Sequence, residues 1–109
     1  MIANRRLKLR NENKDVEVMV RIFAPARDGK AWSCRYEIDW PDGQRAAAGV
    51  GYDSTQALLY ALQMVAAELY SSEFHEAGKL MWTEPSQGYG FPVAQSLRDR
   101  LVGDDAKYL

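Results

Sequence analysis

The chain has 109 residues, 47% of them hydrophobic and 27% charged, and this balance is typical of a globular domain rather than of a disordered chain. Its length predicts a single domain over residues 1–109, of which 103–109 are expected to form a frayed tail. The net charge of −1 gives no general attraction to nucleic acids or anionic membranes.

Alternating apolar and polar residues predict strands in the first half of the chain. The alternation is clear in "RRLKLR" (5–10), "VEVMVRIF" (16–23) and "WSCRYEID" (32–39). It is weaker in "RAAAGVGY" (45–52), because alanine and glycine have a low strand preference. The turn-forming stretches "NENKD", "APARDGKA" and "WPDGQ" separate these strands. Short connections between successive strands predict a four-stranded antiparallel meander.

The period changes to that of a helix between Ser54 and about Phe74. Asp53 or Ser54 is the expected N-cap, with Gln56 completing a capping box, and Gly78 is expected to end the helix. An advance of ~100° per residue places five apolar side chains on the face that should cover the sheet. These are Leu58, Leu62, Val65, Ala66 and Leu69.

The remaining third adds small elements to this plan. "KLMW" (79–82) can form a short fifth strand, and "TEPSQGYGFP" (83–92) is a loop. In "VAQSLRDRLV" (93–102), Val93, Leu97 and Leu101 recur at helical spacing and predict a short C-terminal helix. The sequence therefore predicts an α+β fold, a meander of four or five strands packed by one long amphipathic helix. The candidate core residues are Val18, Val20, Ile22, Trp32, Cys34, Tyr36, Ile38, Leu58, Leu62, Val65 and Leu69.

The two glycines of Gly49-Val50-Gly51 precede the helix, as glycines do in phosphate-binding loops. The third glycine of a dinucleotide fingerprint and the Gly-Lys-Ser/Thr of a P-loop are absent, however. An Asp53 carboxylate at the N-cap would also repel a phosphate. We therefore expect these glycines to permit a bulge or the close packing of helix on strand.

Few residues are candidates for a catalytic or metal site. His75 is the only histidine and Cys34 the only cysteine, whereas a catalytic triad or a zinc site usually draws on more such side chains. Cys34 alternates in register with apolar neighbours, as a small buried residue does. The acidic residues are scattered, and Asp104 and Asp105 fall in the expected tail. We expect no enzyme activity, no cofactor and no metal.

Localisation follows from similar arguments. A single cysteine forms no internal disulfide, and no apolar run approaches the ~20 residues of a membrane span. No apolar segment follows the basic N-terminus, as one does in a secretory signal. These features favour a cytoplasmic protein with no membrane partner.

Two surfaces are candidates for binding. Arg6, Lys8 and Arg10 form the polar face of the first strand and could contact a nucleic-acid backbone. Charges on an edge strand also block sheet-to-sheet aggregation, and this interpretation is favoured because no aromatic residue interleaves with them.

The second surface is a flank of the long helix that holds Tyr60, Met64 and Ala67. These residues lie about 120–180° from the centre of the predicted core face, and tyrosine and methionine are enriched at protein interfaces. Either a partner covers this flank, or the last strand and the C-terminal helix cover it within the monomer.

The order of strands, then "GVGYDSTQALLYALQMVAAELYSS", "GKLMW" and "GYGFP", resembles a family of short bacterial proteins defined as a domain of unknown function. That resemblance runs from about Val16 to Pro92 and implies no activity. Gly51, Asp53, Ser54 and Ala57-Leu58 resemble the strand-to-helix turn of HicB-type antitoxins, although this chain places four strands before the helix.

These observations predict a non-enzymatic protein-interaction module, antitoxin-like, immunity-like or homodimeric, that uses Tyr60, Met64 and Ala67. The alternative is a nucleic-acid-associated domain that uses Arg6, Lys8 and Arg10.

Overall fold

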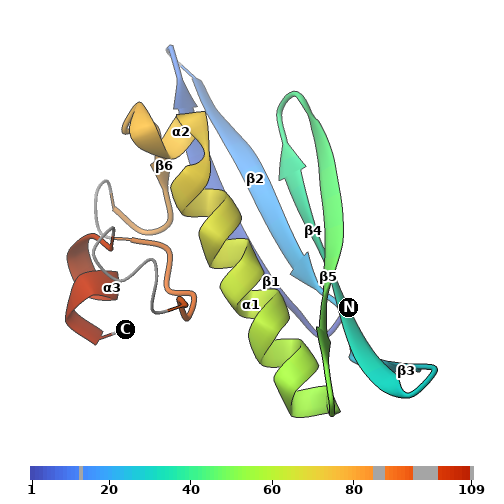
Figure 1. The fold of residues 1–109 in the computed structure, drawn as a ribbon. Helices are drawn as coiled ribbons and strands as arrows, with labels where there is room; N and C mark the ends of the chain where they lie inside the picture. The colour runs from blue at the N-terminus through green and yellow to red at the C-terminus, as the bar shows by residue number, and fades with distance from the viewer. Residues whose placement is uncertain (13, 85–87, 95–100, 109) are drawn as a thin grey trace.

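Four long strands form an antiparallel sheet in a computed structural model that describes residues 1–12, 14–84, 88–94 and 101–108. They are β1 Ala3–Asn11, β2 Lys14–Ile22, β4 Ala31–Trp40 and β5 Gly43–Gly51, joined by the short strands β3 Ala26–Asp28 and β6 Leu80–Met81. The helices are α1 Ser54–Ser71, α2 Glu73–Glu76 and α3 Gly103–Tyr108. Figure 1 shows α1 between β5 on one side and α3 on the other. The predicted α+β meander with one long helix is confirmed.

The pairing of the strands leaves one edge of β5 open. β1 pairs with β2, β2 with β4, and β4 with β5, all antiparallel. The short strands lie elsewhere, because β6 pairs with β1 and β3 pairs with the start of β4. Within the described residues β5 pairs with β4 alone, so its other edge carries backbone N–H and C=O groups without a strand partner.

Two glycines of β5 let α1 lie directly on the sheet. A Cβ atom at Gly49 would stand 2.3 Å from the backbone nitrogen of Ala61, and one at Gly51 would stand 2.7 Å from that of Ala57. Any side chain at these positions would push the helix away from the strand. The expected close packing of helix on strand is confirmed.

Local hydrogen bonds set the ends of the two central helices. Asp53 Oδ1 accepts from the Gln56 N–H at 2.7 Å, and Gln56 Oε1 accepts from the Tyr52 N–H at 2.7 Å. The N-cap is therefore Asp53, one of the two residues predicted for it. Ser72, which is extended, ends α1 and caps α2 by accepting from the His75 N–H at 3.1 Å. Gly78 (φ +70°) ends α2, not α1, in the left-handed conformation typical of such a stop.

The buried face of α1 differs from the prediction in its N-terminal half. Leu58 and Leu62 are only partly buried, whereas Ala57 and Ala61 are fully buried. The reason is the contact with the β5 glycines, which only small helix residues can make at this distance. Trp32 is likewise only partly buried. The other predicted core residues are confirmed as buried: Val18, Val20, Ile22, Cys34, Tyr36, Ile38, Val65 and Leu69.

The C-terminal part departs further from the prediction. The expected fifth strand is present as β6. The helix expected over 93–102 is wrong in its described residues, which have no regular structure at 93–94 and 101–102, while 95–100 lie outside the described residues. α3 instead covers Gly103–Tyr108, where a tail was expected. The helical spacing of apolar residues cannot show which of the two stretches, 93–102 or 103–108, forms the helix, because both are short.

Candidate functional site

An open groove runs along the free edge of β5, with α1 as its other wall. Its volume is about 440 Å³. Its lining residues come from the end of β5 and from one flank of α1: Ala48, Val50, Tyr60, Gln63, Met64 and Ala67. The three helix residues predicted as a contact surface, Tyr60, Met64 and Ala67, therefore lie together on one wall. We call this feature the β5–α1 groove.

The groove continues toward the N-terminus of α1. A second hollow of about 230 Å³ shares Val50 and Tyr60 with the first and adds Tyr52 and Gln56. Tyr52 is 92% exposed, Val50 55% and Tyr60 40%. Large apolar side chains that are this exposed and contiguous mark binding surfaces more often than isolated ones do.

The C-terminal segment does not cover this groove in the described residues. β6 pairs with β1, at the opposite end of the sheet from β5, and α3 lies on the other side of α1 (Figure 1). Of the two explanations that the sequence left open for the helix flank, coverage by the last strand is thus wrong, and α3 does not reach the flank either. Met64 also packs partly against the core, whereas Tyr60 is held at the surface by a 3.2 Å hydrogen bond from Gln56 Nε2 to its hydroxyl.

The strand edge beside the groove lacks the usual protection. Free edges in natural proteins commonly carry charged residues, proline or a bulge, which prevent another strand from pairing. The one charged residue of β5, Arg45, is paired with Glu68 of α1. Residues 46–51 of β5, "AAAGVG", contain none of these residue types, and β5 pairs with β4 without interruption. This edge is therefore open to an additional strand.

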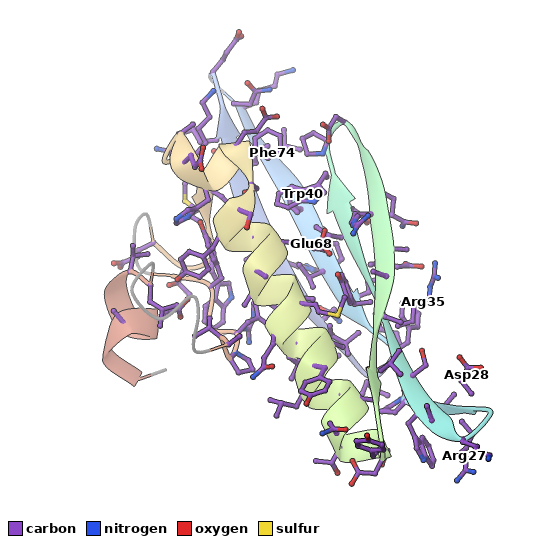
Figure 2. The ribbon with its side chains drawn as sticks, in the orientation of Figure 1. Arg27, Asp28, Arg35, Trp40, Glu68 and Phe74 are labelled. Carbon is purple, nitrogen blue, oxygen red and sulfur yellow. The ribbon has the colours of Figure 1, made fainter. Side chains whose placement is uncertain are left out.

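A polar cluster lies one turn of α1 beyond Met64, at Glu68. Glu68 of α1 accepts a hydrogen bond from the buried Tyr36 hydroxyl and another from Arg45 Nε at 2.9 Å. Figure 2 shows Glu68 on the side of α1 that faces the sheet, whereas Arg35 points away from the helix. Arg45 therefore compensates the carboxylate charge of Glu68, and the residues that line the groove are uncharged. Burial, followed by the Glu68 contact, raises the pKa of Tyr36.

The basic residues of the alternative site lie on the open face of the sheet, opposite α1. Lys8 stands across from Glu17 and Arg10 across from Asp15 on β2, and Arg10 Nε lies 3.4 Å from Asp15 Oδ1. Cross-strand acidic neighbours offset this positive charge. β1 was interpreted as an edge strand. This interpretation is wrong at Lys8 and Leu9, because these two residues pair with β6.

The two residues considered as candidates for catalysis or metal binding, Cys34 and His75, are packed among other side chains instead. Cys34 is buried, and its thiol donates to the carbonyl oxygen of Phe23 at 3.2 Å, as expected for a small buried residue. His75 Nδ1 lies 2.5 Å from the Tyr89 hydroxyl, and its ring meets those of Tyr70 and Tyr89 edge-on. His75 is therefore held among aromatic side chains.

Asp105 is a buried carboxylate that the sequence placed in the tail. It is 2% exposed and accepts hydrogen bonds from the Tyr70 hydroxyl at 2.6 Å and from the backbone N–H groups of Tyr89 and Gly90, both at 2.8 Å. Gly88 leaves room for it, since a Cβ there would stand 2.4 Å from the Asp105 Cγ. These contacts join the C-terminal segment to α1, and no local sequence pattern indicates them.

The described residues hold no cluster of three or more potential metal ligands. Among them, no helix combines the length and apolar character needed to cross a bilayer.

No curated protein and no solved structure matches the chain. A family model, described as a domain of unknown function, matches residues 3–93. This range holds all four long strands, α1, α2 and β6, so the expected match to a domain of unknown function is confirmed, over a longer stretch than predicted. The chain belongs to the DUF6968 family, a domain of unknown function.

Proposed function

We propose that this domain is a non-enzymatic protein-binding module whose binding surface is the β5–α1 groove. The observation that carries the proposal is the position of an exposed apolar groove directly beside an unprotected strand edge. Either feature alone is common. Together they provide both elements of strand addition, in which backbone hydrogen bonds supply affinity and side-chain pockets supply specificity.

The position of the groove beside a strand edge favours an extended protein segment as its ligand. A strand added to β5 would place alternate side chains against Tyr60, Met64 and Ala67, because α1 flanks the sheet at this edge. Tyrosine and methionine adapt to varied apolar partners. The polar groups of the groove, Gln56 and Gln63, are neutral and can bond to backbone groups without a charged partner.

Within this proposal, the protein acts in the bacterial cytoplasm by covering a surface of its partner, as an antitoxin or immunity protein does. The resemblance of Gly51, Asp53 and Ser54 to the turn of HicB-type antitoxins is consistent with that role. Nucleic-acid binding through β1 has weaker support, because Glu17 and Asp15 stand across from its lysine and arginine.

Affinity capture with matched baits tests the proposal. The tagged wild-type chain and the variants Tyr60→Ala and Leu59→Ala are compared by quantitative mass spectrometry. Leu59 is a matched control, because it lies next to Tyr60 on α1, is 42% exposed against 40% for Tyr60, and does not line the groove.

We expect proteins that bind the groove to be retained by the wild-type and Leu59→Ala baits and lost from the Tyr60→Ala bait, since removal of an aromatic anchor often costs more than ~1 kcal/mol of binding. A salt titration tests the nucleic-acid alternative, because the affinity of the protein for a nucleic acid must fall steeply as the salt concentration rises. Identical capture by all three baits would contradict the proposed surface.

A further inference from the structure

The surface of the β5–α1 groove is self-complementary, and this property indicates which partner fits it. We infer that the groove binds a second copy of this chain, whose β5 pairs antiparallel with β5 of the first and joins the two sheets into one. This inference rests on the proposed function and names its partner. It follows from three features of the groove: the strand, the helix flank and the charges.

The strand is self-complementary. Antiparallel pairing of β5 with its own copy, centred on Ala47 or on Ala48, places the small residues of "AAAGVG" against one another. Arg45, the charged residue of this strand, then faces the stretch from Gly49 to Gly51 of the other copy. No two like charges therefore stand opposite each other, as a stable cross-strand pair requires.

The helix flank is self-complementary about the same point. β5 and α1 run in opposite directions, with Gly49 beneath Ala61 and Arg45 bonded to Glu68. The middle of β5 therefore lies beside helix position 64. A twofold axis at this level brings the two α1 helices side by side and antiparallel, as an isologous interface demands.

Large and small side chains then alternate across the axis. Tyr60 lies four residues before Met64, and Ala67 lies three residues after it. The Tyr60 ring of one copy consequently faces Ala67 of the other, while the two flexible Met64 side chains meet near the axis. A heterologous partner gives no reason for this arrangement, whereas a second copy does.

The charges near the axis are already compensated. Glu68 is paired with Arg45 at 2.9 Å and bonded by the Tyr36 hydroxyl. The residues that line the groove are uncharged. Two copies can thus approach along this surface without like-charge repulsion.

Disulfide trapping of the purified full chain tests the pairing directly. Residues opposite each other on antiparallel strands have Cα atoms ~4.5–5.5 Å apart, which suits a disulfide. We expect Ala47→Cys or Ala48→Cys to give a disulfide-linked dimer on mild oxidation. Arg35→Cys is the matched control, because this exposed residue lies on the neighbouring strand β4 and should stay monomeric. The native Cys34 is buried and present in every variant.

Sedimentation velocity supplies the second measurement. The wild-type chain should shift from one to two copies as its concentration rises. Ala48→Lys should raise the dissociation constant by ~10-fold or more, because two like charges would meet near the axis, while its circular dichroism stays that of the wild type.

A wild-type chain that sediments as a single copy at every concentration overturns the inference, and so does a dimer that cross-links through Arg35→Cys rather than through position 47 or 48. The two proposals can fail separately. A monomeric chain whose bait loses a captured protein only on Tyr60→Ala keeps the groove as a binding surface for another partner. A monomeric chain with identical capture by all baits overturns both.

Discussion

At Gly49 the lack of a side chain determines how closely helix and sheet approach. The atoms that a Cβ would meet are the backbone N of Ala61 at 2.3 Å and the carbonyl oxygen of Ala57 at 2.7 Å. Backbone atoms of a helix cannot rotate away, in contrast to the end of a flexible side chain. The position therefore tolerates glycine alone.

Gly49→Ala is expected to destabilise the fold by at least ~1–3 kcal/mol, the usual cost of overpacking, in urea unfolding followed by circular dichroism. The double variant with Ala61→Gly should be no more stable than Gly49→Ala, because the clash is with the backbone and a helical glycine adds its own cost of about 1 kcal/mol. Rescue by Ala61→Gly would show that side chains, not backbone, limit the approach.

Three buried tyrosines predict sensitivity to alkaline pH. Burial is the main cause that raises the pKa values of Tyr36, Tyr70 and Tyr89 above the ordinary value of 10.0, and all three are at most 3% exposed. Since the folded state keeps these protons longer than the unfolded state, the contribution of these tyrosines to the free energy of unfolding should be constant well below pH 10 and fall as the pH rises above it.

Urea unfolding at a series of alkaline pH values measures this effect, and Tyr36→Phe should make the fall shallower by up to one proton. Tyrosine ionisation followed by ultraviolet absorbance should show these three groups titrating together with unfolding. Ionisation of all tyrosines near pH 10 in a chain that is still folded would contradict the burial of their hydroxyl groups.

At the scale of elements, the periodicity of the sequence predicts structure that depends on neighbouring residues, and it misses contacts between residues far apart in the chain. The three clear strands, the long helix and its Asp53 cap follow from alternation, helical spacing and capping chemistry over fewer than about 20 residues. The burial of Asp105 depends on Tyr70, 35 residues away, and no local pattern contains such a contact. The helix flank of the groove was predictable from its ~100° spacing, whereas its other wall, Val50 and Tyr52, depends on which strand lies at the sheet edge.

The orientation of α1 gives a prediction that separates the two leucine positions. Leu69 is fully buried, whereas Leu62 is only partly buried. Leu69→Ala should lower the free energy of unfolding by about 2–5 kcal/mol, and Leu62→Ala by only about 1–2 kcal/mol, since less area returns to water. Equal losses in urea unfolding would mean that the helix is rotated toward the leucine face that the spacing predicted.

At the scale of the whole molecule, the described part of the chain covers one end of the sheet and leaves the other end open. The C-terminal segment is fastened beside β1 and α1 through Leu80, Tyr89 and Asp105. At the other end, β5 has an edge that no other described strand pairs with, and the adjacent groove exposes Val50 and Tyr60. The proposed binding surface accounts for this asymmetry, because β5 of a second copy would cover the open end.

Hydrogen–deuterium exchange of the wild-type chain as a function of protein concentration tests this surface most directly. Backbone amides at a free strand edge exchange readily, and pairing with a second strand protects them. We expect peptides from β5, residues 43–51, to exchange more slowly as concentration rises, while peptides from β1, residues 3–11, do not change. Protection that is independent of concentration in β5, or that increases instead in β1, would contradict self-association through the β5–α1 groove.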